Sequence, residues 1–311
     1  MTVKLDVVST VGLPTGDTVE IIRRRFSGGA GMRVAVVAGV RGDTPEGVRV
    51  AHLVGHALEA VHESLSGTVD IYPCVNPLAA HRGSRHWPFF DQDLNRRFPG
   101  RGQGHAPDRV AWELVRDLTG ADLVIEVRGA HPAFSETAQA HVRFGDDEAA
   151  QRALKTNVNI VWNRKPGPAA PSTLVYQFPG AIVLEGGRGN RLTEGVGVAL
   201  RDGILNLLNH LKVVPDKGLP FHWAAVTRPE IVTDAQVFRV RSDEGGLFLP
   251  DLTPWDPVEP GTRIGQIIDP IDGRIRQELV AKVAGRLVAV REQPVVFPGN
   301  MVARLVEVSG G

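Results

Sequence analysis

The 311-residue sequence predicts an α/β fold: a mostly parallel or mixed sheet with helices on both faces, followed by a small C-terminal all-β domain. Two observations lead to this prediction. From about residue 18 to 211, apolar strand-like runs alternate with amphipathic segments, a pattern typical of a sheet covered by helices. Beyond residue 220, short apolar runs alternate with turns rich in Gly, Pro and Asp, which indicates a small β domain.

The elements of the first part follow from these patterns in order. "RVAVVAGV" (33–40) is an apolar run typical of a buried strand, and 45–65 is amphipathic with a proline near its first turn, which predicts a helix. The remaining predictions are strands at 69–75, 122–127 and 180–187, and helices at 107–119 and 193–211, the last with Thr193 as candidate N-cap. A turn-rich segment, 213–220, separates the predicted domains 1–215 and 221–311.

Composition restricts the function classes. With 35 Lys+Arg and 35 Asp+Glu residues, the balanced charge gives no reason to expect binding to nucleic acid or to an anionic membrane. One cysteine, Cys74, excludes an internal disulfide framework and fits a reducing compartment. We find neither a signal-peptide pattern nor an apolar run of about 20 residues, and therefore expect a cytoplasmic protein.

A charged residue stands at the end of the first buried strand. In "VVAGVRGDTPEG" (36–47), Arg41 lies between Gly39 and Gly42. Because ligands of α/β proteins bind at the carboxyl ends of strands, Arg41 is a candidate site residue.

The stretch 76–106 is too long for an ordinary connection, which favours a functional segment. It combines four aromatic residues with several arginines, so its composition argues against disorder. Arginine forks beside Asn95 suit planar recognition of a carboxylate. The alternative is a surface loop with solvated arginines.

"NPLAAHRGSR" (76–85) followed by "DQDLNRRFPG" (91–100) resembles the succinylglutamate desuccinylase/aspartoacylase family, part of the zinc carboxypeptidase-like superfamily. Further similar segments follow the family's order along nearly the whole chain: "AGVRGDTPEG" (38–47), "DLVIEVRGA" (122–130), "PGAIVLEGG" (179–187), "EPGTRIGQIID" (259–269) and "VAGRLVAV" (283–290). The last two resemble the family's C-terminal β domain.

The resemblance implies roles for particular residues. Asn95 and Arg96 would bind a substrate carboxylate, with Arg82 or Arg85 assisting. Glu185 would be the general base that activates water and later protonates the leaving amine.

The positions of the family's zinc ligands differ here. Where the family has a histidine, a glutamate and a second histidine, this chain has Arg41, Thr44 and Arg128. A guanidinium group has no acceptor and a pKa above about 12, so it cannot ligate a cation. We therefore expect no family zinc site, and we predict no cofactor.

Other histidines are weaker candidates. His52 and His56 lie four residues apart on the predicted helix, and His56 with Glu59 forms an HxxE string. No third ligand is evident, so these side chains are better explained as ordinary helix residues. Three more histidines could lie nearer to the site: His81, His86 and His131.

Because the family positions converge on one ion, the resemblance implies that Arg41 and Arg128 approach each other. Two like charges 4 Å apart repel by about 4 kcal/mol at an effective dielectric constant near 20. Such a pair needs a counter-charge from Glu185, Asp43, Glu126 or an anionic ligand. We therefore predict an anion-binding pocket.

Three functions remain open. The first is a metal-independent enzyme acting on an anionic N-acyl or amide-containing amino-acid derivative, with Glu185 as acid/base and Arg41 and Arg128 as oxyanion stabilisers. The second is a non-catalytic anion-binding protein, in which Glu185 only pairs with the arginines. The third is zinc-dependent deacylation with ligands unlike the family's. The expected partner is a small anionic substrate, and the sequence is compatible with a homo-oligomer.

Overall fold

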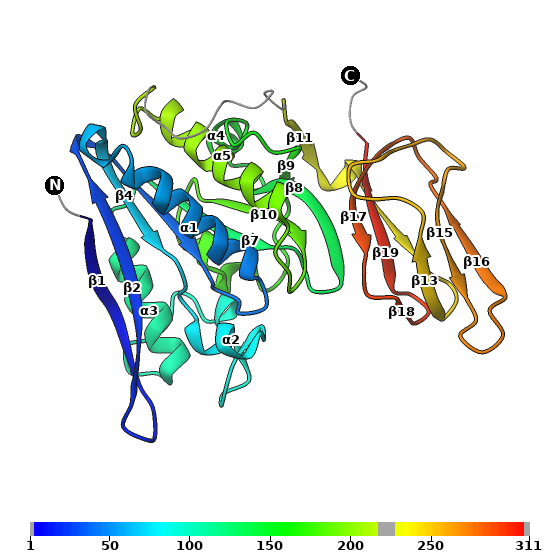
Figure 1. The fold of residues 1–311 in the computed structure, drawn as a ribbon, viewed down its shortest axis with the longest axis horizontal. Coiled ribbons are helices and arrows are strands. Elements are labelled where there is room, and N and C mark those ends of the chain that lie inside the picture. Colours follow the sequence, from blue (N-terminus) through cyan, green and yellow to red (C-terminus); the bar gives the residue numbers. More distant parts are fainter. Residues whose placement is uncertain (1–2, 217–227, 308–311) are drawn as a thin grey trace.

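A computed structural model of the chain describes residues 3–216 and 228–307. The strands of its large mixed sheet are β1 (Lys4–Gly12), β2 (Thr18–Ser27), β3 (Gly29–Ala38), β4 (Ser66–Tyr72), β7 (Leu123–Gly129), β8 (Phe134–Arg143), β9 (Ile160–Arg164), β10 (Ile182–Arg188), β11 (Glu230–Thr233), β12 (Val237–Arg241), β14 (Pro257–Val258), β17 (Gly285–Arg291) and β19 (Met301–Val306). Their main order is β1-β2-β4-β3-β7-β10-β8-β17-β19-β12 (Figure 1).

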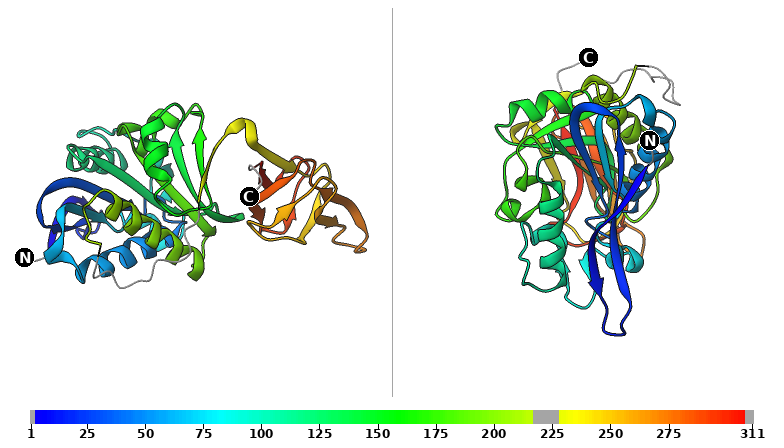
Figure 2. Two further views of the ribbon diagram at one scale, coloured as in Figure 1. Left: turned by 90° about the horizontal axis from the view of Figure 1, so that it is seen from above. Right: turned by 90° about the vertical axis from the view of Figure 1, so that its left-hand side faces the viewer.

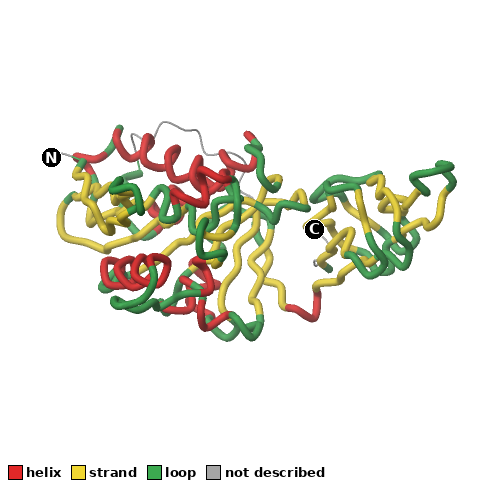
Figure 3. Tube along the Cα trace, turned by 90° about the horizontal axis from the view of Figure 1, so that it is seen from below, coloured by secondary structure: helices red, strands yellow, loops and turns green. Residues whose placement is uncertain are grey.

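Helices cover both faces of this sheet (Figure 3). One face packs against α1 (Pro45–Glu59), α4 (Asp147–Ala153) and α5 (Glu194–His210), and the other against α3 (Ala106–Leu118). Each face of the sheet therefore has its own hydrophobic core, because successive side chains of a strand point to opposite faces. In β3, Val34 and Val36 belong to the α1/α5 core, whereas Ala35 and Val37 belong to the α3 core.

Strand direction also agrees with the predicted class. β4, β3, β7 and β10 run parallel to one another, while β8 is antiparallel to β10. The prediction of a mostly parallel or mixed sheet with helices on both faces is thus confirmed.

The C-terminal strands form a second β-rich part (Figure 2). A four-stranded antiparallel sheet has the order β16-β15-β13-β18, with β13 (Gly246–Pro250), β15 (Arg263–Ile268), β16 (Ile275–Val280) and β18 (Val295–Val296). Strand β17 pairs with β8, so part of this region continues the large sheet. The predicted linker 213–220 lies partly outside the described residues, and the two-domain boundary stays a prediction.

The stretch 76–106 is ordered. It contains α2 (Pro77–Arg82), the short hairpin β5 (His86–Trp87) and β6 (Gln92–Asp93), and a 3-10 turn at Leu94–Arg96. Its apolar side chains Trp87, Leu94 and Phe98 are buried in the α3 core, which holds the segment against the sheet.

Some boundaries differ from those predicted. The helix predicted at 45–65 ends at Glu59, because Val61 leaves the helical conformation (φ −126°, ψ 10°). Thr193 occupies the N-cap position of α5, but its hydroxyl accepts a hydrogen bond from the backbone N–H of Arg188 and does not cap the helix. No helix among residues 3–216 and 228–307 combines the length and apolarity needed to cross a bilayer.

Candidate functional site

The candidate site lies on the α3 face of the sheet, where strands β7, β10, β8 and β9 lie side by side. Register places Arg128 beside Glu185, and Val183 beside His141. Paired residues of neighbouring strands project to the same face of a sheet, as do residues two positions apart in one strand. Glu185 is paired with Arg128 and lies two residues after Val183, the partner of His141, so all three side chains share one face. The β8–β9 pairing adds Trp162 and Arg164 to this face through their partners His141 and Arg143.

Two glycines set the position of Arg41 just beyond β3. Gly39 has a left-handed backbone (φ 67°), which turns the chain at the strand end. At Gly42, a Cβ atom would lie only 2.0 Å from the backbone carbon of Ala79 in α2, so the loop depends on glycine there. The intervening Arg41 is thereby directed into the pocket.

Glu185 is held by two neighbours. Its Oε2 accepts a hydrogen bond of 2.5 Å from Nε of Arg128, and its Oε1 lies 2.6 Å from Nε2 of His141. All three side chains are largely buried: 15% of Arg128, 11% of Glu185 and 6% of His141 is exposed. Nδ1 of His141 is buried without a hydrogen-bond partner, and the Trp162 ring packs on the imidazole.

Burial and neighbouring charges determine the protonation states of Arg128, Glu185 and His141. Burial alone would raise the pKa of Glu185, but Arg128 and His141 outweigh burial and hold this pKa well below its usual range. Burial would lower the pKa of Arg128, yet Glu185 and Glu126 raise it. For His141, burial wins over Glu185 and lowers the pKa. Glu185 and Arg128 are therefore ionised, and His141 is neutral at pH 7.

Arg41 is in a different environment. Its Nε is buried without a hydrogen-bond partner. Burial, followed by the charges of Arg128 and Arg85, lowers its pKa to about 10, and Glu126 and Asp93 offset this only in part. Arg41 is thus a charged group at pH 7 that lacks full compensation.

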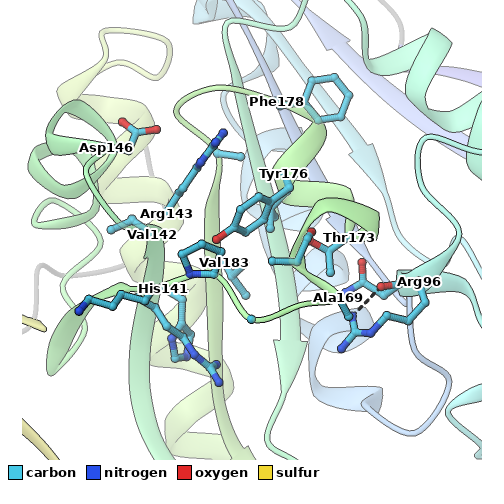
Figure 4. A pocket seen from close by; sticks show the side chains of 18 of the residues that line it. Arg96, His141, Val142, Arg143, Asp146, Ala169, Thr173, Tyr176, Phe178 and Val183 are labelled. Atoms are coloured by element: carbon cyan, nitrogen blue, oxygen red, sulfur yellow. Dashed lines mark hydrogen bonds between the residues drawn. The ribbon is translucent and has the colours of Figure 1, made fainter. Parts of the chain in front are cut away.

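A pocket of about 340 Å³ opens beside these residues (Figure 4). Figure 4 shows Arg96 near Thr173 and Ala169 on one side, Arg143 on the opposite side, and Tyr176 between them. Six cationic side chains line the pocket: Arg41, Arg96, Arg128, Arg143, Arg164 and Lys165. The acidic residue in the lining is Asp146, whose carboxylate accepts hydrogen bonds from the backbone N–H groups of Ala149 and Gly180.

The residues expected to bind a carboxylate are divided between two places. Asn95 and Arg96 line the pocket; Asn95 is buried, with Oδ1 accepting from the N–H of Leu174 at 2.9 Å. Arg82 and Arg85 line a separate surface hollow on the hairpin side instead. The guanidinium group of Arg85 is already paired with Asp93, at 2.7 Å.

The other histidines lie outside the pocket. His52 and His56 are exposed on α1, against the opposite face of the sheet, as expected for ordinary helix residues. His81 is exposed, and His86 pairs with Asp91. His131 has an exposed surface, but the protein around the rest of its ring reduces hydration. This desolvation and the charges of Arg85 and Arg41 lower the pKa of His131, and the charge of Asp43 opposes them.

Several polar residues around the pocket are absent from the sequence-based predictions, among them His141, Arg143, Asp146, Arg164, Lys165 and Tyr176. They come from β8, β9, the segments that follow these strands and the 3-10 turn Leu174–Gln177, for which no elements are predicted. Arg143 and Arg164 each end a strand, which is a weak signal in the sequence. His141 has no local signal, because its role depends on pairing with β10.

The donor set of the expected zinc positions does not fit zinc. Arg128 presents N–H donors to Glu185, and the Thr44 hydroxyl is bonded to the backbone oxygen of Arg41. Neither guanidinium group has a lone pair for a cation. Among the described residues, no three His, Cys, Asp or Glu side chains are grouped so as to hold a metal ion.

Comparisons with known proteins agree with the fold. Residues 30–211 match the family model of the succinylglutamate desuccinylase/aspartoacylase catalytic domain. An N-alpha-acetyl-L-2,4-diaminobutyric acid deacetylase from Halomonas elongata is 28% identical over 295 residues, which cover 90% of this chain and 83% of that protein.

Two solved structures are similar over most of their length. One is a succinylglutamate desuccinylase/aspartoacylase from Rhodobacter sphaeroides (TM-score 0.80, 22% identity, 96% of this chain and 93% of that chain). The other is the product-bound ectoine utilization protein EutE (DoeB) from Ruegeria pomeroyi (TM-score 0.79, 22% identity, 96% and 93%). At this identity both support the fold alone. Because the family model matches more than half of the chain, the protein belongs to the succinylglutamate desuccinylase/aspartoacylase family.

Proposed function

We propose that this protein is a metal-independent enzyme that binds a small anionic amino-acid derivative and acts on its N-acyl or amide group. The observation behind the proposal is that Arg41 and Arg128, at the expected zinc positions, line one pocket. Guanidinium groups can donate to a carbonyl oxygen and stabilise the negative charge that develops on it. The Halomonas elongata relative, named as a deacetylase of an N-acetylated diamino acid, supports an N-acyl amino acid as the substrate.

In this proposal Asn95 and Arg96 bind the carboxylate of the amino acid, and Arg41 is the principal donor to the carbonyl oxygen, since Arg128 is engaged by Glu185. Proton movement belongs to Glu185 and His141 together. Glu185 stays ionised because of its low pKa, so it orients the imidazole through Nε2. The unpartnered Nδ1 of His141 then accepts a proton from the water that attacks the carbonyl carbon, and returns it to the amine as the C–N bond breaks.

The proposal is tested by assaying the purified full chain, with and without a chelator, on N-acetyl-L-2,4-diaminobutyrate and N-acetyl-L-aspartate. We expect turnover that the chelator leaves unchanged, in protein that holds no stoichiometric zinc by elemental analysis. Turnover that disappears with chelation and returns with zinc would instead establish zinc-dependent deacylation with ligands unlike the family's.

A second candidate is a binding protein without turnover. Both carboxylate oxygens of Glu185 are engaged, by Arg128 and His141, as expected for a counter-ion that supports an arginine-lined pocket. Glu185→Gln separates the two candidates. An enzyme loses turnover while retaining ligand affinity, whereas a binding protein shows ligand binding and no turnover even in the wild-type chain.

A further inference from the structure

At the mouth of the pocket lies a second group of cations, distinct from Arg41 and Arg128. It consists of Arg143, Arg164 and Lys165, which we call the mouth cluster. Arg143 and Arg164 occupy paired positions at the ends of the parallel strands β8 and β9, and Lys165 follows directly. Register therefore keeps the first two cations adjacent on one face of the sheet.

Aromatic rings hold the mouth cluster in position. The Cζ atom of Arg143 lies 5.1 Å from the centre of the Tyr176 ring, and that of Arg164 lies 4.8 Å from the Trp162 ring. Nζ of Lys165 is 5.5 Å from the Phe144 ring. Stacking on a ring orients a cation but leaves its charge and its N–H donors available.

The mouth cluster lacks an acidic partner. Among the described residues, no carboxylate lies within ion-pair distance of its three cationic groups. The nearby Asp146 uses its carboxylate oxygens for the N–H groups of Ala149 and Gly180. Asp234 also lies beside the cluster, but its carboxylate accepts from the indole N–H of Trp162 and the backbone N–H of Lys165. Cations that line one pocket without an ion pair favour an anion that carries more than one charge.

The mouth cluster is also separated from the predicted carboxylate clamp. Figure 4 shows Arg143 and Arg96 on opposite sides of the pocket, with Tyr176 between them. A ligand whose carboxylate lies at Asn95 and Arg96 can therefore place its other end at the mouth cluster.

We propose that the mouth cluster binds a phosphate group at the distal end of the substrate, so that the ligand is a phosphorylated N-acyl amino acid. A phosphate monoester carries about −1.5 to −2 charges at pH 7 and three strong acceptor oxygens, which match three cationic donors better than one carboxylate does. This inference rests on the proposed function for the placement of the amino-acid end.

The test is calorimetric titration of the full chain with three probes: N-acetyl-O-phospho-L-serine, N-acetyl-L-glutamate and N-acetyl-L-serine. We expect the phosphorylated probe to bind about tenfold more tightly than N-acetyl-L-glutamate, and N-acetyl-L-serine to bind most weakly. Arg143→Gln and Arg164→Gln should each weaken binding of the phosphorylated probe about tenfold, with a smaller effect on N-acetyl-L-serine.

Arg239→Gln is the matched control. Arg239 is exposed on β12, which β17 and β19 separate from β8 in the sheet. Equal affinity for the phosphorylated and dicarboxylate probes would overturn the phosphate assignment. Unchanged affinity in both mouth variants, or an equal loss in Arg239→Gln, would overturn the location.

Inorganic phosphate, titrated separately, distinguishes failure of this inference from failure of the proposed function. If no N-acetyl amino acid binds but phosphate does, and its binding requires Arg143 and Arg164, the proposed function is wrong and the phosphate site stands. The opposite result is that N-acetyl-L-glutamate binds, inorganic phosphate does not bind, and N-acetyl-O-phospho-L-serine binds no more tightly than N-acetyl-L-glutamate. In that case only the phosphate site is wrong.

Discussion

Arg128 and Glu185 occupy paired positions of the parallel strands β7 and β10, and the Nε of Arg128 donates a hydrogen bond of 2.5 Å to Oε2 of Glu185. The acid that the family resemblance assigns to catalysis is thus also the counter-ion of an arginine at an expected zinc position. Each side chain is ionised because the other is present. Under the proposed function, stability and turnover are therefore linked at this pair.

Removing one partner of the pair should destabilise the protein strongly. We expect Arg128→Met to lower the free energy of unfolding at pH 7 by about 3–5 kcal/mol, because it leaves Glu185 as a buried charge without its main partner. Urea unfolding measures the change. The double variant Arg128→Met/Glu185→Leu should recover part of the loss, since it removes the buried charge of Glu185 but leaves Glu126, which lies 3.5 Å from Arg128 in the wild-type chain. A loss below about 1 kcal/mol in the single variant would contradict a buried ion pair.

Arg41 should show the opposite relation between stability and function. Its charge is poorly compensated, as the lowered pKa of about 10 indicates. Arg41→Met should therefore raise the free energy of unfolding of the ligand-free protein by roughly 1 kcal/mol, because groups that serve ligand binding often destabilise the ligand-free protein. The same variant should lose affinity for N-acetyl amino acids. Thermal unfolding and calorimetry measure both quantities, and a destabilised variant with unchanged affinity would contradict the role assigned to Arg41.

The sequence predicts the fold well because strand and helix periodicities are strong over β3, α1, α3 and α5, and because the segment similarities run in the family's order. Strand β8 is different. It carries Glu136, Gln139 and His141, polar residues that are nonetheless buried, so the apolar pattern of a core strand is missing. Their burial depends on pairing with β10 and β9, which is tertiary information.

The position of Arg41 at the end of β3 can be predicted from the sequence pattern, and the family resemblance implies that Arg128 and Glu185 lie near it. The site was not predictable where long-range pairing decides position. Arg85, expected to assist in carboxylate binding, is paired with Asp93 in the hairpin β5–β6. Conversely, His141 contacts Glu185 because β8 pairs with β10 in this register. Spacing along the sequence contains neither fact.

A second buried charge cluster should control acid stability. Asp70 has no exposed side-chain surface and accepts hydrogen bonds from Arg25 and Arg33 at 2.7 and 2.8 Å. Burial would raise the pKa of Asp70, but these arginines outweigh burial and lower it from 3.8. Since the folded-state pKa lies below the unfolded one, the stabilisation is complete above about pH 4 and is lost as the pH falls through the folded-state pKa.

We therefore expect Asp70→Asn to cost about 3–5 kcal/mol at pH 7, with the difference from wild type shrinking below about pH 4. Urea unfolding from pH 3 to 7 measures this dependence. Glu148→Gln is the control, because the pair of Glu148 with Arg152 on α4 is exposed and should contribute less than about 1 kcal/mol. A pH-independent cost of Asp70→Asn would contradict the ionic role of Asp70.

His141 should titrate below the usual histidine range and thereby set the acid limit of activity. Burial lowers its pKa from 6.5 despite the charge of Glu185. We expect the imidazole NMR signal that disappears in His141→Gln to titrate with a midpoint below pH 6.5, and Glu185→Gln to shift this midpoint lower still, because the carboxylate favours the imidazolium. As the pH falls through the midpoint, protonation of Nδ1 removes the proposed proton acceptor and adds a positive charge to the pocket. Turnover should then decrease while affinity for anionic ligands increases. A midpoint above 6.5, or turnover and affinity that decrease together, would show that His141 is not the acceptor.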